Sequence, residues 1–290
     1  MQTTGIFKTH RHEVVAQEGK PWLLIPFGDV HRSAPLCHVE KWYDFLEWCK
    51  LKLTEYKGRV LFLGMGDYDD LASASERRIL GSGDLHESTA KTLDQLYKDN
   101  VNRLSKELSF MRGHLIGCIE GNHYATLTSG ITSTQLMCEK LQCPYLGVSA
   151  FVRLTFKRAA QQHSRYSVDI WAHHGKGASR LVGGSLNRVQ QMAEAAEADI
   201  YLMGHDHRKS VGMTSKLYLS DGGGEMRLSY RKHIYGRTGS FLKGYEPGEA
   251  SYIADAAMSP TDLGNISITM VPKRNKDRGR SFVVDLQASL

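Results

Sequence analysis

The sequence lacks the features of exported, disulfide-stabilised and membrane-spanning proteins. Its five cysteines are scattered and odd in number, and no two of them form a CxxC pair. This spacing favours neither a disulfide framework nor a zinc-thiolate site. No apolar run approaches the roughly 18 residues that a membrane span requires, and the amino terminus has no apolar stretch of the kind found in secretory signals. We therefore expect a cytoplasmic protein without a membrane partner.

The chain also has no internal repeat, no low-complexity tract and no nucleotide-binding P-loop. The run Gly222–Gly224 is not followed by the Lys-Ser/Thr pair that a P-loop requires. Hydrophobic residues make up 41% and charged residues 23% of the 290 positions, which is typical of soluble globular proteins. A chain of this length can form one α/β domain, so we expect a single domain over residues 1–290.

Positive charge is in modest excess. The net charge of +6 and the pI near 9.0 favour a polyanionic partner. Two basic stretches, Arg227–Arg237 and Lys273–Arg280, could follow a nucleic-acid backbone. The alternative is that they are solvated faces of strands or turns.

Apolar runs typical of buried strands alternate with helical patterns, which predicts a layered α/β fold. The predicted strands are Trp22–Phe27, Val60–Met65, Leu115–Ile119, Tyr145–Phe156, Ser167–Ala172 and Ile200–Met203. Apolar residues at helical spacing predict helices over Val39–Leu53, Leu93–Met111 and Leu186–Ala196. Between the first two helices, Asp69–Glu87 is predicted to be a loop-rich insertion that overhangs a site.

After residue 207 the pattern changes to short apolar runs separated by Gly, Pro and charged turns. The predicted strands there are Leu217–Leu219, Met226–Tyr230, Ile266–Val271 and Phe282–Leu286. Residues 208–290 are therefore expected to add β structure that closes a sandwich.

Five short polar motifs follow directly after predicted strands. They are Gly28-Asp29-Val30-His31, Gly66-Asp67-Tyr68-Asp69-Asp70, Gly121-Asn122-His123, His173-His174-Gly175 and Gly204-His205-Asp206-His207. Open α/β folds collect their ligand-binding residues at the carboxyl ends of strands. A single Asp or His beside a Gly is usually a turn residue or a cap. Five such motifs together would gather carboxylate, amide and imidazole groups at one edge, where cations would relieve the repulsion between carboxylates.

The order DxH, GDxxD, GNH, HG and GHxH, from residue 29 to residue 207, resembles the signature of the calcineurin-like metallophosphoesterases. The strings HHGKG, GHDHRK and GRTGSFLKGY are more loosely similar to metallophosphoesterases encoded by bacteriophages, which would place the protein in a host cytoplasm. The resemblance implies a four-layer αββα sandwich with a dinuclear metal site at the carboxyl ends of the strands.

The resemblance also implies a ligand set. Asp29, His31 and His207 would hold one divalent ion, and Asn122, His174 and His205 the other. Asp67 would bridge the two ions. His173 is the alternative to His174. Carboxylate, amide and imidazole ligands without thiolate suit Mn²⁺ first, with Fe, Zn²⁺ or Mg²⁺ as alternatives.

The family's histidine that does not bind metal matches His123, which implies a role as general acid or phosphoryl stabiliser. Tyr124 follows it where an acidic residue often stands, so the partner that orients His123 is open, with Glu120 as one candidate. Weaker substrate-binding candidates beside the motifs are Arg32, Tyr68, Tyr124, His173, Lys176, Arg180 and Arg208. For the charged members of this set, the alternative is an ordinary solvated side chain. Tyr68 and Tyr124 could either stack on a base or pack over the rim of the site.

The leading functional hypothesis is a metal-dependent phosphodiesterase acting on nucleic acid or a nucleotide, with a DNA nuclease as its most concrete form. The first alternative is a phosphomonoesterase, including a protein phosphatase, because the same two-metal centre serves both reactions. A remote alternative is a binding module that has lost its chemistry.

Overall fold

The computed structural model describes most of the chain. The described residues are 7–80, 85–158, 165–177, 179, 181–220, 226–255, 257, 259–260, 262–274 and 283–290. They form a mixed α/β fold with eleven strands in two mixed sheets and six α-helices. Within these residues, no helix combines the length and the apolar character needed to cross a membrane.

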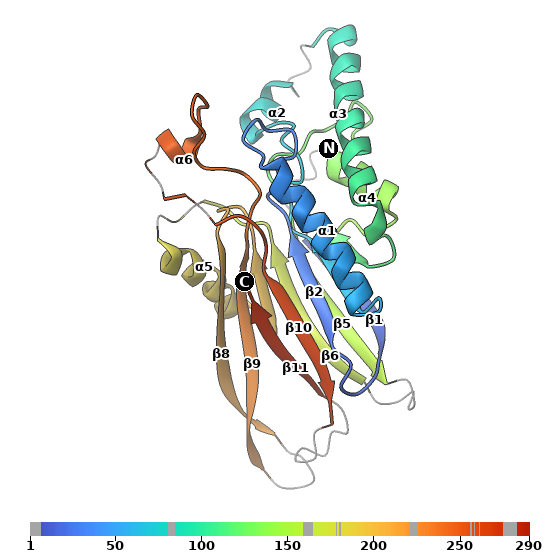
Figure 1. Cartoon of the computed structure of the whole chain (residues 1–290), viewed down its shortest axis with the longest axis vertical. Coiled ribbons are helices and arrows are strands. Elements are labelled where there is room, and N and C mark those ends of the chain that lie inside the picture. Colours follow the sequence, from blue (N-terminus) through green and yellow to red (C-terminus); the bar gives the residue numbers. More distant parts are fainter. Residues whose placement is uncertain are drawn as a thin grey trace.

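The larger sheet has six strands in the order β1-β5-β6-β7-β9-β8. Their bounds are Phe7–Ala16 (β1), Ser149–Arg158 (β5), Arg165–His173 (β6), Ile200–Met203 (β7), Arg227–Thr238 (β9) and Lys209–Ser220 (β8). β6, β7 and β9 run parallel to one another, and β8 and β9 form a long antiparallel hairpin. The hairpin extends beyond the rest of this sheet, at the lower end of Figure 1.

The smaller sheet has five strands in the order β11-β10-β2-β3-β4. Their bounds are Val283–Ser289 (β11), Ser267–Lys273 (β10), Trp22–Phe27 (β2), Val60–Gly64 (β3) and Leu115–Cys118 (β4). β2, β3 and β4 are parallel, whereas β10 and β11 are added antiparallel at one side. The strands after residue 207 therefore extend both sheets, with β8 and β9 in the larger and β10 and β11 in the smaller.

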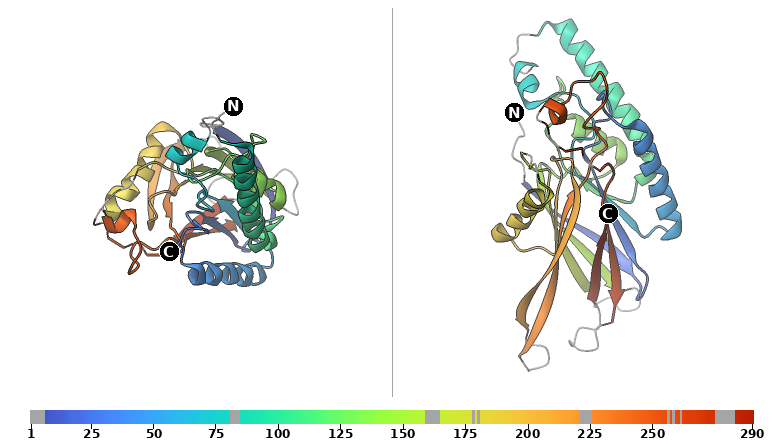
Figure 2. Two further views of the ribbon diagram at one scale, coloured as in Figure 1. Left: turned by 90° about the horizontal axis from the view of Figure 1, so that it is seen from above. Right: turned by 60° about the vertical axis from the view of Figure 1, so that its left-hand side comes forward.

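The helices lie on the outer faces of the two sheets and above their upper ends (Figures 1 and 2). Their bounds are Val39–Glu55 (α1), Ala74–Leu80 (α2), Glu87–Glu107 (α3), Ser133–Leu141 (α4), Val182–Ala195 (α5) and Tyr252–Asp255 (α6), with a 3₁₀ turn at Ser109–Met111 (η1). Seen from above, α1, α3 and α4 lie to one side of the sheets and α5 lies to the other (Figure 2).

Three apolar cores correspond to this arrangement. The largest joins the inner faces of the two sheets and includes Leu63 of β3 and Val152 of β5. A second lies between the smaller sheet and α1, α3 and α4, with Trp42 fully buried at its centre. The third packs α5 through Val189 against Tyr201 of the larger sheet. Because both faces of β2 and β3 are covered, their sequences are continuous apolar runs rather than alternating ones.

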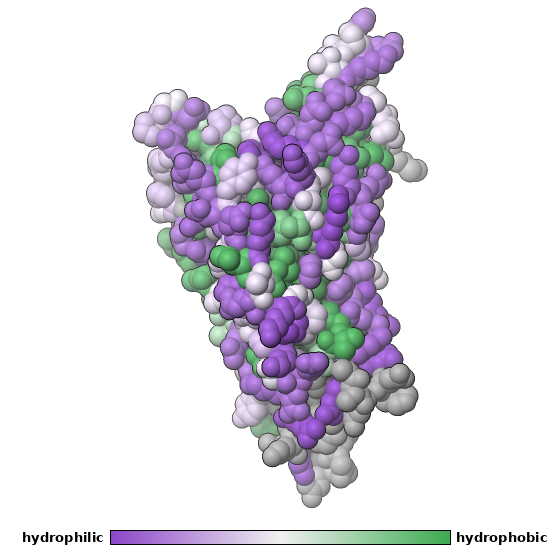
Figure 3. Space-filling view, turned by 45° about the vertical axis from the view of Figure 1, so that its right-hand side comes forward, coloured by the Kyte–Doolittle hydropathy of each residue, from purple (hydrophilic) through white to green (hydrophobic). Residues whose placement is uncertain are grey.

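The surface turned forward in Figure 3 is largely hydrophilic, and its apolar residues form small separate patches. α1 and α3 each bury one apolar stripe and turn their polar side outward, which is typical of surface helices.

The strands predicted at β2 and β7 have the bounds found in the structure, and the three predicted helices correspond to α1, α3 with η1, and α5. The strand predicted to begin at Tyr145 begins at Ser149, because Tyr145 makes only an isolated bridge to Cys118. The short carboxyl-terminal strands were predicted too short, since β8 and β9 have 12 residues each. Phe282, predicted to begin the last strand, lies outside the described residues.

Candidate metal centre

The five polar motifs follow strands at the ends that point upward in Figure 1, and side chains from both sheets come together there. Three of them follow the parallel strands β2, β3 and β4 of the smaller sheet, and two follow the parallel strands β6 and β7 of the larger sheet. Backbone hydrogen bonds join the first two motifs, from Asp29 N to Gly66 O at 2.9 Å and from Val30 N to Asp67 O at 2.8 Å. The sheet topology therefore brings together residues that lie far apart in the sequence.

One group of possible metal ligands consists of Asp29, His31 and His207, whose ligand atoms lie within 4.8 Å of one another. His31 Nε2 is 3.2 Å from His207 Nε2, and His207 Nε2 is 3.6 Å from Asp29 Oδ1. Two imidazole nitrogens bound to one ion at about 2.0–2.1 Å would lie roughly 2.9–3.4 Å apart. The geometry of this group therefore fits one cation.

A second group consists of Asp67, His174 and His205, again within 4.8 Å of one another. The Asn122 side chain joins it, because its Oδ1 lies 3.0 Å from His174 Nε2 and 2.7 Å from His205 Nδ1. His174 Nε2 is also 3.1 Å from Asp67 Oδ2. These residues are the ones that the family resemblance implied for the second ion.

Asp67 belongs to the second group but also lies close to the first. Its Oδ2 is 3.1 Å from His174 Nε2 in one group and 3.8 Å from His31 Nε2 in the other. Its Oδ1 accepts backbone hydrogen bonds from Asn122 N at 2.6 Å and His123 N at 2.9 Å, which fix the orientation of the carboxylate. A carboxylate in this position can contact two ions at once.

Only glycine fits next to this carboxylate. A Cβ atom on Gly121 would lie 1.9 Å from Asp67 Oδ1 and 2.3 Å from Asp67 N. The absence of a side chain therefore allows the Gly-Asn-His turn to approach Asp67 closely enough for the two backbone hydrogen bonds.

Five of the candidate ligands have left-handed backbone conformations. The φ angles are 47° at Asp29, 48° at His31, 48° at Asp67, 74° at His205 and 59° at His207. This region is uncommon for residues other than glycine, although Asp, Asn and His enter it more readily than most. Strained backbone of this kind is concentrated at functional sites, where the surrounding structure maintains it.

The electrostatics of the cluster also fit cations. Burial, with a contribution from the nearby Asp67 carboxylate, raises the pKa of Asp29 to about 8 against the opposing effect of His174. Burial lowers the pKa of His205 to about 4, with His174 contributing, and it holds the pKa of His207 well below its ordinary value. Asp67 and His174 shift the other way. Burial opposes both shifts, but their mutual contact holds the pKa of Asp67 well below its ordinary value and raises the pKa of His174 to about 9. The buried Asp29 carboxyl and the imidazoles of His205 and His207 lack compensating charge, which bound cations would supply.

His174, rather than His173, contacts the cluster. His174 Nδ1 lies 2.8 Å from Met65 O and donates to it, which leaves Nε2 as the atom directed at Asp67 and Asn122. Metal-binding histidines usually donate their other ring N–H in this way. His173 Nδ1 instead accepts a hydrogen bond from Gly175 N at 2.7 Å.

The partner of His123 differs from the candidate suggested by the sequence. His123 Nδ1 lies 2.5 Å from Asp70 Oδ1, the last residue of the GDxxD motif. Glu120 is instead fully buried, and its Oε2 accepts a hydrogen bond from the Tyr145 hydroxyl at 3.0 Å. Burial lowers the pKa of His123, but the hydrogen bond to Asp70 and the charge of Asp67 outweigh it, so the pKa is raised. The spacing of the GDxxD motif was the available signal for this partner.

Sequence reasoning missed Arg77 of α2. Its Nη1 atom donates to the backbone carbonyls of Ala72 at 2.5 Å, Asn122 at 2.7 Å and Tyr124 at 2.9 Å. The guanidinium also lies 3.8 Å from the centre of the Tyr124 ring. Arg77 therefore connects the predicted insertion, which contains a helix, to the turn that carries His123. An arginine within a Ser- and Gly-rich segment gave no signal of this role.

Most weak substrate-binding candidates are engaged within the protein. Arg32 pairs with Glu107 at 3.0 Å and donates to the Tyr43 hydroxyl, also at 3.0 Å. Arg208 is buried and donates to Ser179 O at 3.2 Å.

Among the tyrosine and lysine candidates, Tyr68 is buried and donates to Ile119 O at 2.8 Å, so it cannot stack on a substrate base. Lys176 is exposed beside the site. Arg180 lies outside the described residues.

Three basic side chains of β9 make contacts within the protein rather than standing unpaired on its surface. Arg237 is buried, donates to Gly204 O at 2.8 Å and lies 3.4 Å from Asp206. Arg231 pairs with Asp199 at 2.7 Å, and Lys232 with Asp285 at 2.9 Å. These side chains bind acidic residues or support the GHxH turn.

In the second basic stretch, Lys273 also pairs with Asp285, at 2.8 Å, and Arg274 with Glu18 at 2.9 Å. Residues 275–280 of this stretch lie outside the described residues.

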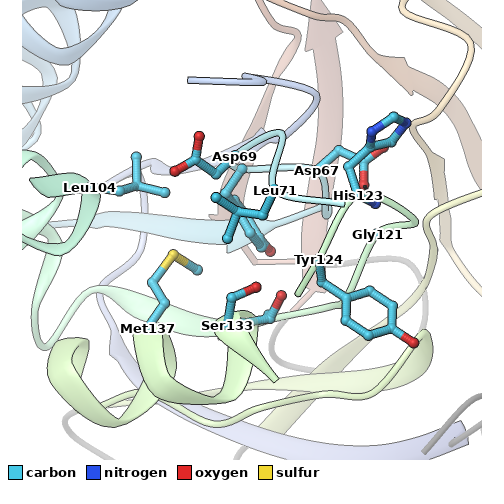
Figure 4. Close-up of a pocket in the computed structure, with 11 residues that line it drawn as sticks. Asp67, Asp69, Leu71, Leu104, Gly121, His123, Tyr124, Ser133 and Met137 are labelled. Atoms are coloured by element: carbon cyan, nitrogen blue, oxygen red, sulfur yellow. Dashed lines mark hydrogen bonds between the residues drawn. The ribbon is translucent and has the colours of Figure 1, made fainter. Parts of the chain in front are cut away.

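A small cavity of about 20 Å³ lies behind Asp67 and His123, with Leu104 and Met137 on its apolar side (Figure 4). The Tyr124 ring points away from His123 in this view. A space of this size holds about one water molecule and excludes a phosphate ester. The cluster is exposed to solvent at Asp70 and His123, whose side chains are 35% and 27% exposed.

Comparisons with known proteins add little. No protein-family model matches the chain, and no curated protein matches it in sequence. Among solved structures, it is similar to Vps29 from Chaetomium thermophilum, with 12% identity and a TM-score of 0.33 over 92% of this chain and 96% of that chain. The same protein complexed with the RaPID-derived cyclic peptide RT-D3 gives 12% identity and a TM-score of 0.25 over 64% and 85%. TM-scores this low carry no argument about this chain.

Proposed function

We propose that this chain is a phosphoesterase that uses two divalent metal ions, built as the four-layer αββα sandwich of the calcineurin-like metallophosphoesterases. The observation that carries the proposal is the position of Asp67 between two groups of possible ligands, 3.1 Å from His174 and 3.8 Å from His31. Asp29, His31 and His207 would hold one ion, and Asn122, His174 and His205 the other. Mn²⁺ is the first candidate for this set of oxygen and imidazole ligands, with Fe, Zn²⁺ and Mg²⁺ as alternatives.

When bound, the two ions would activate a water molecule as nucleophile and neutralise charge on the phosphoryl group. His123 would act from the solvent-facing side. Its Nδ1–H donates to Asp70, which leaves the Nε2 proton for the leaving oxygen. Burial lowers the pKa of His123, but the hydrogen bond to Asp70 and the charge of Asp67 raise it overall, which favours the protonated ring that a general acid requires.

Phosphodiesters of nucleotides or nucleic acid are the first substrate hypothesis, supported by the net charge of +6. Small phosphomonoesters are the second, and one observation favours them. The β9 cations that could follow a polymer are already paired, Arg231 with Asp199 and Lys232 with Asp285. A DNA nuclease would need other contacts to hold its substrate.

A substrate panel with a matched variant tests the proposal. Bis-p-nitrophenyl phosphate, p-nitrophenyl phosphate, cyclic nucleotides and single- and double-stranded DNA would each be assayed with Mn²⁺, Mg²⁺, Zn²⁺ or a chelator. We expect turnover that requires metal and falls by roughly 10²–10³-fold or more in Asp67→Asn. Binding of a phosphorylated or nucleic-acid ligand without turnover in any metal would instead indicate a binding module.

A further inference from the structure

Three of the five cysteines meet on the outer side of the smaller sheet, outside the candidate metal centre. Cys118 ends β4, Cys138 lies in α4, and Cys143 lies in the turn that follows α4. One sulfur atom from each lies within 4.8 Å of the others. Cys49, by contrast, is buried in α1 and does not belong to this group.

The local structure around α4 brings these cysteines together. Thr132 and Gln135 form a capping box that fixes the start of α4, and Gln142 ends the helix with a left-handed φ of 56°. The chain then turns back onto β4, where Cys118 N donates to Pro144 O at 3.0 Å and Cys118 forms a bridge with Tyr145. The approach of the three thiols is therefore supported by backbone hydrogen bonds on both sides.

The distances fit a shared metal ion better than a disulfide. The sulfur atoms of Cys118 and Cys143 lie 3.9 Å apart. Two thiolates bound at about 2.3 Å to one tetrahedral ion lie roughly 3.8 Å apart, whereas a disulfide requires about 2.05 Å. A disulfide would use two of the thiols and leave the third out, but a metal ion can use all three.

The charge state of the group is consistent with metal binding. Hydrogen bonds from Cys118 and Cys138 lower the pKa of the Cys143 thiol to about 4. Cys143 is also only partly buried, while Cys118 and Cys138 are fully buried. Hydrogen bonds within the group, together with burial, raise the pKa of Cys118 and Cys138, so an incoming cation has to displace the protons of these two thiols.

We propose that Cys118, Cys138 and Cys143 form a binding site for one thiophilic cation of the Zn²⁺ or Cu⁺ type. Thiolate ligands select these ions over the harder ones that suit carboxylate and amide ligands. Binding releases the protons of the remaining thiols to solvent and forms three metal–sulfur bonds. The site is chemically distinct from the candidate dinuclear centre, whose ligands contain no sulfur.

The thiol site lies close to the segments that carry the dinuclear centre. The Tyr68 hydroxyl, one residue after Asp67, contacts Cys118 and donates to Ile119 O at 2.8 Å. From Cys118 the chain continues directly into Asn122 and His123. An ion at the thiol site would therefore hold the end of β4 from which the third motif begins.

Titration of the reduced full-length protein with Cd²⁺ tests the proposal, because cadmium–thiolate bonds give an ultraviolet charge-transfer band that carboxylate and imidazole ligands do not. We expect this band to reach its endpoint at one Cd²⁺ per chain. Cys143→Ala should weaken Cd²⁺ binding by more than the roughly 10–100-fold that loss of an outer-shell partner costs. Cys49→Ala, which removes a buried thiol from α1, should leave the endpoint and the affinity unchanged. A parallel titration with Cu⁺ shows which type of ion binds more tightly.

Circular dichroism and thermal unfolding of each variant establish that the comparison is made on folded protein. Cys138→Ala provides a second test if Cys143→Ala unfolds. Three results would overturn the proposal. They are the absence of a thiolate band in the reduced protein, a band of equal strength in Cys143→Ala, and a Cys118–Cys143 disulfide whose reduction does not create a cadmium site.

Discussion

Asp70 Oδ1 lies 2.5 Å from His123 Nδ1, and this contact joins the second and third motifs across 53 positions of sequence. The same His123 ring lies 4.8 Å from the ring of His31, a candidate ligand. Asp70 therefore places the proposed proton donor beside one proposed ion. Asp70, His31 and His123 also offer ligand atoms within 4.8 Å of one another. Its position after β3 and the position of His123 after β4 make the contact a direct result of strand pairing.

Asp70→Asn should lower turnover by about 10–100-fold, which is part of the roughly 10²–10⁴-fold that a general acid contributes. The loss should be greater for a substrate with a poor alkoxide leaving group than for p-nitrophenolate, which needs less protonation. Steady-state rates on a pair of such substrates measure this difference. Glu120→Gln is the control, because Glu120 contacts Tyr145 rather than His123. Equal losses on both substrates would argue against positioning of a general acid.

Asp67→Asn should reduce both the metal content and the rate, because one carboxylate is proposed to serve two ions. We expect the rate to fall by roughly 10²–10³-fold or more, the loss typical of removing one preorganised electrostatic group. Elemental analysis of purified protein provides the metal count. Asp94→Asn is the matched control, since Asp94 is buried in α3 and accepts hydrogen bonds from Thr128 outside the cluster. Two ions per chain and a normal rate in Asp67→Asn would remove Asp67 from the site.

Arg77→Met should slow turnover while the metal content stays the same. Loss of the three carbonyl contacts would free the turn that carries His123, and a displacement of about 1 Å can cost up to about 10²-fold. Arg78→Met, an exposed neighbour in the same helix, should have almost no effect. The decisive measurements are kcat and metal stoichiometry for both variants. A loss of bound metal in Arg77→Met would show that Arg77 supports the ligands rather than His123.

Arg231→Met should lower the free energy of unfolding by about 1–3 kcal/mol, because it leaves Asp199 buried without its ion pair. The Arg231 side chain is 36% exposed, which favours the lower end of this range. Thermal unfolding measures the change, with exposed Lys20→Met as the control. If the chain binds DNA, Arg231→Met and Lys20→Met should show the same dependence of binding affinity on salt concentration. A weaker salt dependence in Arg231→Met alone would indicate that Arg231 contacts a DNA phosphate.

Buried and strongly periodic elements could be predicted from the sequence. β2 and β7 are continuous apolar runs, and α1 places Trp42, Phe45, Leu46 and Cys49 on one buried face. β1 was missed because its buried positions are confined to Val14 and Ala16, and most of its other side chains are polar. Its strand conformation comes from pairing with β5, which no local pattern reveals. α4 was missed although Thr132 and Gln135 carried a capping-box signal.

The candidate site was predictable as a set of residues but not as a set of contacts. The five motifs were visible because each follows an apolar strand. The choice between His173 and His174 needed the position of Met65 O, which belongs to a neighbouring motif. The basic character of β9 was misleading for the same reason, since Asp199 and Asp285 lie far away in sequence and adjacent in space. Local sequence shows which charges are present, whereas tertiary packing decides which of them are neutralised.

Each of the two ligand groups takes side chains from both sheets. Asp29 and Asp67 follow strands of the smaller sheet, while His174 and His207 follow strands of the larger one. Each proposed ion would therefore cross-link the smaller sheet to the larger one at the edge of the core between them. Ligands that bind only the folded state stabilise it in proportion to their concentration and affinity. Removal of the metal would thus lower the free energy of unfolding as well as the proposed activity. The two sheets would separate more readily, and the chain would become more susceptible to proteolysis.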